Sequence, residues 1–237
     1  MAMIIVPGLC MAFDQPGILN PAQVADSSIR RIALTFDDGP KPPFTEELID
    51  ELAEARVRAT FFVVGRQAQK YPELVRELMA HGHEIANHSW DHPSVRTLSA
   101  AALKAELDKT RIFLKQLTGK DTPLFRAPGG TVEYLRHKVV VPEGYEMVMW
   151  TVHTLDHEKP SADLIRERVL TGARDGGVIL FHTGVRSTME ALPGLIRTLR
   201  SEGYVFVTVS ELLGGAPASL APALVSPFRG FAHPSFS

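Results

Sequence analysis

The chain has little of what marks disulfide-stabilised, nucleic-acid-binding or membrane-spanning proteins. It contains one cysteine, Cys10, so it can form neither an internal disulfide nor a thiolate zinc site. Its formal net charge is −2, and no basic field is available to neutralise phosphates. No apolar run reaches the roughly 18 residues that a membrane span needs. We therefore expect neither nucleic acid nor a membrane span.

What remains is ordinary globular composition, with 45% hydrophobic and 22% charged residues over 237 positions. We predict a single domain over residues 30–213. Residues 1–29 begin with an apolar stretch that is broken by Pro7-Gly8 and lacks Lys or Arg before it, which makes a poor secretion signal. A signal remnant and an arm packed on the domain both stay open for it. Residues 214–237 are rich in Ala, Pro, Ser and Gly and are interpreted as an irregular tail.

Short apolar runs alternate with longer amphipathic ones along the middle of the chain. The runs predict strands at 32–36, 60–64, 83–86, 124–126, 146–152, 178–181 and 205–209. The amphipathic segments predict helices at 44–55, 72–81, 99–118, 162–170 and 189–202. Strands that alternate with helices pair in parallel through crossovers, and about seven such units favour a closed or nearly closed α/β barrel.

Polar side chains follow five of the predicted strands. In an α/β barrel the loops after the strands gather on one face, where active sites form. We therefore expect these segments, distant in sequence, to converge. The residues concerned are Asp37, Asp38, His88, His92, Arg126, Asp156 and His182.

The first two segments carry a set of residues typical of a metal site. Adjacent carboxylates on a strand point in opposite directions, so one of Asp37 and Asp38 can bind a metal while the other faces a water. A turn is the alternative, since Asp-Asp-Gly-Pro is good turn chemistry. His88 and His92 have a common metal-ligand spacing, although two surface histidines beside Pro93 would look the same. With Asp38 they make a two-His, one-carboxylate set that suits zinc and other borderline divalent ions.

Two further residues admit both a structural and a catalytic interpretation. His182 ends a nearly all-apolar run, so it is either a core histidine or a general acid whose ordinary pKa lies near neutrality. Arg126 either makes a structural salt bridge or orients a catalytic carboxylate.

These segments resemble the five ordered motifs of the polysaccharide deacetylases (carbohydrate esterase family four, the NodB-like domain). The resemblance runs from about Arg30 to Leu213. It is carried by TFDDGP at 35–40, HSWDH at 88–92, RAPGG at 126–130, TLD at 154–156 and LFH at 180–182.

The resemblance implies a fold and a set of roles. The fold is a distorted (β/α) barrel of about seven parallel strands. The implied roles are catalytic base for Asp37, metal ligands for Asp38, His88 and His92, partner of the base for Arg126, catalytic acid for His182, orientation of that acid for Asp156, and a wall of the acetyl pocket for Leu180. The implied cofactor is a divalent metal ion. Zinc is the favoured metal, and cobalt, nickel and manganese are the alternatives.

The chain departs from the family pattern around the substrate. Gly129 stands where the family usually has Tyr, which keeps the backbone N–H expected to hold the oxyanion but opens the sugar site. His153 and His157 replace the usual Asp and Trp of the fourth motif, and a second metal there is disfavoured because Asp156 already has a role. Trp90 is either a sugar-stacking surface or packed under its loop, and Trp150 is expected in the core.

The expected function is metal-dependent removal of N-acetyl groups from a GlcNAc-containing polymer, by a monomer whose partner is the acetylated glycan. Peptidoglycan is favoured over chitin-like oligosaccharides on family prevalence, and acetylated xylan stays chemically open. The alternatives are hydrolysis of a small non-sugar amide on the same fold and a non-catalytic carbohydrate-binding module. Polymers of this kind lie outside the cytoplasm, which favours secretion or the cell envelope in spite of the poor signal.

Overall fold

The computed structural model describes residues 18–19, 29–129 and 132–214. Most of the segment predicted for residues 1–29, and all but the first residue of the tail predicted for 214–237, lie outside these ranges. None of the helices in the described part of the chain is long and apolar enough to cross a membrane.

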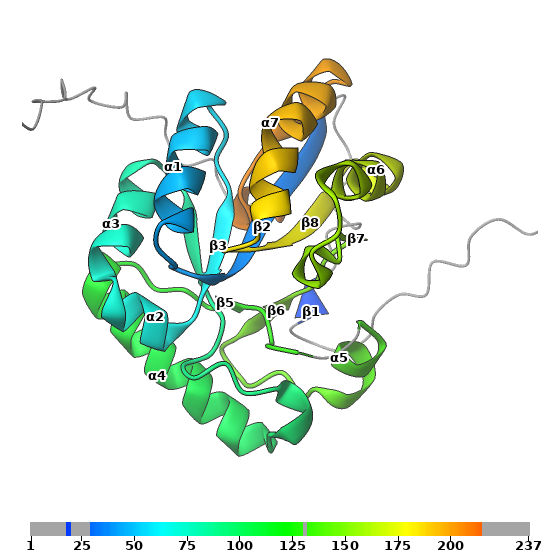
Figure 1. Ribbon diagram of the computed structural model, residues 1–237. Coiled ribbons are helices and arrows are strands. Elements are labelled where there is room, and N and C mark those ends of the chain that lie inside the picture. The colour runs from blue at the N-terminus through cyan, green and yellow to red at the C-terminus, as the bar shows by residue number, and fades with distance from the viewer. Residues whose placement is uncertain (1–17, 20–28, 130–131, 215–237) are drawn as a thin grey trace, which may run out of the picture.

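Nine strands in the described ranges form one sheet in which every pairing is parallel (Figure 1). Their order is β1-β6-β5-β4-β3-β2-β8-β7, and β9 pairs with the start of β2. The strands are β1 (Ile18–Leu19), β2 (Arg30–Gly39), β3 (Thr60–Val63), β4 (Glu84–Asn87), β5 (Leu124–Phe125), β6 (Glu146–Val148), β7 (Val152–His153), β8 (Gly177–His182) and β9 (Tyr204–Phe206).

The sheet curls into a distorted barrel. This follows from β6 and β7, which lie toward opposite ends of the strand order but are joined by residues 149–151 alone, so the two ends of the sheet must lie near each other. This confirms the single α/β barrel domain. The one strand expected over 146–152 is wrong, since the chain leaves β6 and crosses to β8 on the other side. There the Thr151 N–H donates to the Val178 carbonyl, and the Thr151 hydroxyl accepts from the Val178 N–H at 2.9 Å.

Helices surround the sheet and connect its strands (Figure 1). They are α1 (Phe44–Glu54), α2 (Gly65–Lys70), α3 (Pro72–Ala80), α4 (Ala100–Thr118), α5 (Val132–Lys138), α6 (Ala162–Gly172), α7 (Arg186–Ser201) and α8 (Val209–Leu212). The five predicted helices are confirmed as α1, α3, α4, α6 and α7. In α4, for example, the Ser99 hydroxyl accepts from the Ala102 N–H at 3.2 Å, and Leu103 and Leu107 are buried. The short helices α2, α5 and α8 were not predicted, because they span too few residues to show a periodic pattern.

The alternation of side chains along β2 sets the position of the site. Ile32, Leu34 and Phe36 are fully buried against the helices, and each such side chain contributes about 1.5–3 kcal/mol. Thr35 and Asp37, the next residues in the alternation, point the other way, into the barrel. A carboxylate therefore stands at the carboxyl end of the barrel interior.

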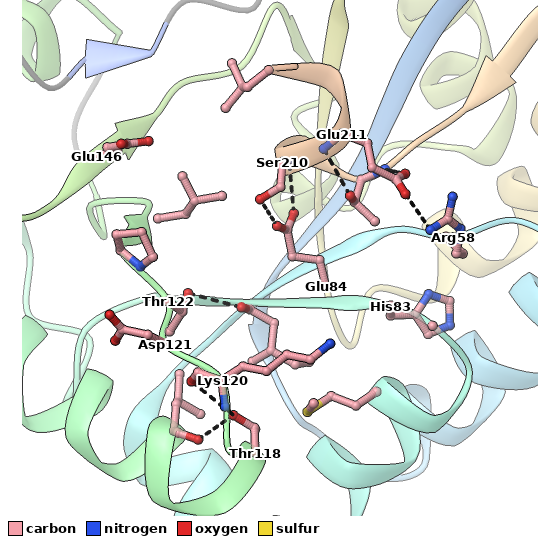
Figure 2. Close-up of a pocket in the computed structure, with 18 residues that line it drawn as sticks. Arg58, His83, Glu84, Thr118, Lys120, Asp121, Thr122, Glu146, Ser210 and Glu211 are labelled. Atoms are coloured by element: carbon pink, nitrogen blue, oxygen red, sulfur yellow. Dashed lines mark hydrogen bonds and ion pairs between the residues drawn. The ribbon is translucent and has the colours of Figure 1, made fainter. Parts of the chain in front are cut away.

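The amino ends of the strands are closed by a different set of contacts, around a cavity of about 430 Å³ (Figure 2). Arg58 pairs with Glu211 at 2.5 Å, and the Ser210 hydroxyl donates to Glu84. The strand expected over 205–209 ends early here, because Thr208 caps α8 in a capping box with Glu211. In α/β barrels the active site forms at the opposite, carboxyl end of the strands.

Candidate active site

A cleft of about 530 Å³ lies at the carboxyl ends of the strands. Its lining includes six of the seven polar residues that were expected to converge, namely Asp37, Asp38, His88, His92, Arg126 and His182. The seventh, Asp156, is fully buried and contacts His182 from behind. The structure thus brings together all seven residues from segments that are far apart in the sequence.

Asp37 is held by a buried arginine. Arg126, which follows β5, donates from Nη1 to Asp37 Oδ1 at 2.7 Å and to the Thr35 hydroxyl oxygen at 2.9 Å. The Thr35 hydroxyl in turn donates to the Ile179 carbonyl at 2.6 Å. The guanidinium therefore occupies one oxygen of Asp37 and leaves Oδ2 available to the cleft.

The two adjacent carboxylates do not diverge as expected. Asp38 has φ = 72°, and the register of β2 with β3 shifts between Asp37 and Gly39. This bulge turns the Asp38 side chain back toward the side that Asp37 faces. As a result, Asp37 Oδ2 and Asp38 Oδ1 lie 3.8 and 3.3 Å from the same atom, His88 Nε2.

Asp38, His88 and His92 form a group that could hold a metal ion, with ligand atoms all within 4.8 Å of one another. Asp38 Oδ1 lies 3.1 Å from His92 Nε2 and is buried without a hydrogen bond. His88 Nδ1 donates to the Arg126 carbonyl at 2.8 Å, which leaves the lone pair of Nε2 facing Asp38. An orphaned carboxylate oxygen between two imidazole nitrogens is the donor set that a borderline divalent cation prefers, so these residues fit a metal.

Asp38 and His92 shift each other's pKa in opposite directions. Burial alone would raise the pKa of Asp38, but interactions with His88 and His92 hold that pKa far below its usual range. The interaction with Asp38 raises the pKa of His92 against the opposing effect of burial. Because a histidine must be neutral to bind a metal, protons compete with the cation at His92 as the pH falls.

His182, at the end of β8, is oriented by Asp156. Its Nδ1 lies 2.6 Å from Asp156 Oδ1, while Oδ2 accepts from the His182 backbone N–H at 2.8 Å and from the Thr188 hydroxyl at 2.7 Å. Burial would lower the pKa of His182, but the hydrogen bond to Asp156 and the nearby charge of Asp37 outweigh burial and raise the pKa. The ring thus keeps its proton into a higher pH range with Nε2 left free.

Trp90 does not line the cleft. Its side chain is buried, packs edge-on against Phe113 with ring centroids 5.7 Å apart, and lies under Lys109. A Cβ added at Gly65 would approach Trp90 Cε3 to 2.4 Å, so the indole fills the space directly above that glycine. The assignment of Trp90 as a substrate-binding residue is therefore corrected to the packing alternative.

The expectation for Trp150 is met only in part. The side chain is partly buried and packs against two clusters of the core, and it also lines the cleft. Its ring begins a row that continues through His153 and His157 to His182, with successive centroids 5.4, 5.6 and 5.2 Å apart. Asp156, His157 and His182 could formally hold a second metal, but both oxygens of Asp156 already accept hydrogen bonds.

Gly129 and Leu180, the two other predicted substrate-binding residues, both line the cleft. Gly129 has φ = 63°, and an added Cβ would come within 3.1 Å of Ser94 Oγ. Two residues that contribute to the site were not predicted. Thr188 lies in a helix rather than at a strand end, and Arg96 lies in a short 3₁₀ turn (Val95–Thr97), so neither fits the strand-end pattern.

The fold and the site define an α/β-barrel protein with a polar site of hydrolase type on the carboxyl face. The chain belongs to the polysaccharide deacetylase family: residues 25–148 match the family model described as "Polysaccharide deacetylase".

Several bacterial proteins are similar over most of the chain. A peptidoglycan-N-acetylglucosamine deacetylase of Bacillus cereus is 37% identical over 77% of this chain and 87% of its own length. PgdA of Listeria monocytogenes, of the same description, is 37% identical over 78% of this chain, which spans only 39% of that relative. The peptidoglycan-N-acetylmuramic acid deacetylase PdaC of Bacillus subtilis is 35% identical over 82% of this chain and 41% of its own length. A solved structure of PdaC superposes with a TM-score of 0.70 over 83% of this chain and 93% of that one, at 34% identity.

Proposed function

We propose that the chain is a metal-dependent hydrolase that removes N-acetyl groups from GlcNAc residues of a polysaccharide, with peptidoglycan preferred to chitin-like oligosaccharides. One observation carries this proposal. Asp37 and His182 are register partners on neighbouring strands, one held by Arg126 and the other by Asp156. A base and an acid thus flank the same three-residue metal group, which is what hydrolysis of an unreactive amide requires.

Each side chain has one part of the reaction. Asp37 Oδ2, the oxygen that Arg126 leaves free, accepts the proton of the attacking water. His182 donates the proton on Nε2 to the departing amine, because its Nδ1 is engaged by Asp156. A divalent cation held by Asp38, His88 and His92 would supply Lewis-acid polarisation of the carbonyl and of the water.

Two neighbouring groups complete the site. The backbone N–H of Gly129 stabilises the negative charge on the carbonyl oxygen, a role that glycine performs as well as tyrosine. Leu180, buried in the cleft wall, contacts the acetyl methyl group.

The names of the relatives support the substrate class and leave the sugar open. Two act on N-acetylglucosamine and one on N-acetylmuramic acid of peptidoglycan. Hydrolysis of a small non-sugar amide is less well supported. Proteins of this fold that act on such amides tend to lack metal ligands, whereas this chain has Asp38, His88 and His92 together.

The test is acetate release from peptidoglycan and from chitopentaose, by the protein as prepared, after chelation, and after zinc is restored. We expect release to fall on chelation and to return with zinc. The Asp37→Asn variant is the matched control: with its fold checked by circular dichroism, because the substitution leaves the buried Arg126 without its counter-charge, it should still bind zinc and release no acetate. Full activity in the metal-free protein would rule out the metal-dependent mechanism, and inertness on every acetylated glycan would favour a carbohydrate-binding role.

A further inference from the structure

Arg96 is a cation of the cleft with no part in the proposed reaction. It lies in the 3₁₀ turn, and the N–H of the preceding residue, Val95, donates to the Pro128 carbonyl at 2.9 Å. This bond fixes the turn to the loop that carries Gly129. The guanidinium lies 4.9 Å from the centroid of the Tyr134 ring, so a cation–π contact restricts its position.

The other charges of the cleft are already paired. Arg126 is fully buried and pairs with Asp37, while Asp38 Oδ1 lies 3.3 and 3.1 Å from the Nε2 atoms of His88 and His92. Among the side chains that the structure describes, none with a carboxylate contacts Arg96. Exposed arginines elsewhere on the molecule do form ion pairs, as Arg186 does with Glu47 at 2.6 Å.

Arg96 lines the same cleft as Gly129 and the metal group. The turn that carries Arg96 packs closely on Gly129, because a Cβ added at Gly129 would come within 3.1 Å of Ser94 Oγ, two residues before Arg96. A glycan bound at the metal group therefore shares the cleft with the guanidinium.

We propose that Arg96 binds a carboxylate carried by the glycan, and so makes the site selective for carboxylate-bearing strands over neutral ones. This inference rests on the proposed function. A guanidinium offers a planar pair of N–H donors that matches the two oxygens of a carboxylate, which a neutral chitin-like chain lacks. Two sources of this group occur in peptidoglycan, the lactyl ether of a muramyl residue and the stem peptide attached to it.

The experiment compares three substrates: chitopentaose, glycan strands stripped of peptide so that the lactyl carboxylates are free, and intact peptidoglycan fragments. Arg96→Gln and Arg96→Lys are measured beside Arg76→Gln, an equal change of charge at an exposed position of α3 outside the cleft. The readout is the ratio of kcat/KM for each anionic substrate to that for chitopentaose. Binding constants in the Asp37→Asn background give a second readout that needs no turnover.

We expect Arg96→Gln to lower the ratio by about fivefold, through KM rather than kcat, as is typical of an exposed ion pair. Arg96→Lys should keep part of the preference for the anionic substrates, and Arg76→Gln should keep all of it. In the unmodified protein, added salt should weaken this preference. A loss confined to stripped strands assigns the contact to the lactyl carboxylate, and a loss confined to intact fragments assigns it to the stem peptide.

An unchanged ratio, or an equal change in Arg76→Gln, would overturn the role of Arg96 while leaving the deacetylase proposal intact. If no substrate is deacetylated, the proposed function fails, and the binding constants still decide whether Arg96 selects a carboxylate.

Discussion

The guanidinium of Arg126 donates to the carboxylate of Asp37 across 2.7 Å, and both side chains are almost completely buried. Two charges taken out of water need each other, because either one alone would be left unsolvated. The same contact decides which oxygen of Asp37 faces the cleft. Folding and the proposed chemistry therefore depend on one ion pair.

Arg126→Met is expected to lower both stability and activity. It removes the counter-charge of a buried carboxylate, which costs about 3–5 kcal/mol of unfolding free energy, and acetate release should fall at least a hundredfold. Urea unfolding and kcat/KM measure the two effects. The double variant Asp37→Asn/Arg126→Met is the control and should recover part of the stability but none of the activity. A single variant as stable as the unmodified protein would show that the pair is not mutually required.

Replacement of Asp156 is expected to move the pH profile. The hydrogen bond to Asp156 contributes to the raised pKa of His182, and the acid works only while it is protonated. Activity should therefore decline as the pH rises through that raised pKa, and Asp156→Asn should shift the decline to lower pH. The variant should also lose about 10²–10⁴-fold in rate. Thr188→Val, which removes one hydrogen bond to Asp156 Oδ2 and no charge, should shift the profile less. An alkaline limb that does not move in Asp156→Asn would exclude His182 as the acid.

Zinc is expected to stabilise the folded protein through Asp38, His88 and His92. A ligand at 100 times its Kd adds about 2.7 kcal/mol, which thermal unfolding with and without zinc would detect. Because the pKa of His92 is raised, the stabilisation should shrink as the pH is lowered through that pKa. His92→Ala should abolish it, whereas His81→Ala, at an exposed histidine at the end of α3, should not. An equal zinc-dependent shift in His92→Ala would place the metal elsewhere.

Trp90 is expected to affect stability rather than substrate affinity. Trp90→Ala should cost about 3–5 kcal/mol of unfolding free energy, as large buried aromatic side chains do. Gly65→Ala should also destabilise, because the new methyl group would lie 2.4 Å from the indole, and it should cost less when Trp90 is already alanine. A Trp90→Ala protein of unchanged stability but raised KM for glycans would restore the sugar-stacking interpretation.

The sequence predicted the barrel and the convergence of the site, because both follow from local signals. Apolar runs mark the strands, and parallel strands bring their carboxyl ends to one face. The bulge at Asp38 could not be predicted, since its left-handed backbone depends on pairing with two neighbouring strands. The break between β6 and β7 could not be predicted either. Residues 146–152 are mostly apolar and look like one strand, and only the closure of the barrel divides them into two. The packing of Trp90 depends on Gly65, a contact between segments that no local pattern reveals.

Gly129 offers a test that separates backbone from side-chain effects in the cleft. Gly129→Ala should lose about 1–2 kcal/mol of stability, because alanine is unfavourable at φ = 63°, and its methyl group would also press on Ser94 Oγ at 3.1 Å. Adding Ser94→Ala should relieve the contact but not the backbone cost. Since alanine keeps the N–H that we assign to the oxyanion, kcat should change only a few-fold in both variants, as measured on chitopentaose. A hundredfold loss of kcat in the relieved double variant would mean that the cleft requires the conformation or the open space of glycine, and that the N–H alone does not account for the role of this position.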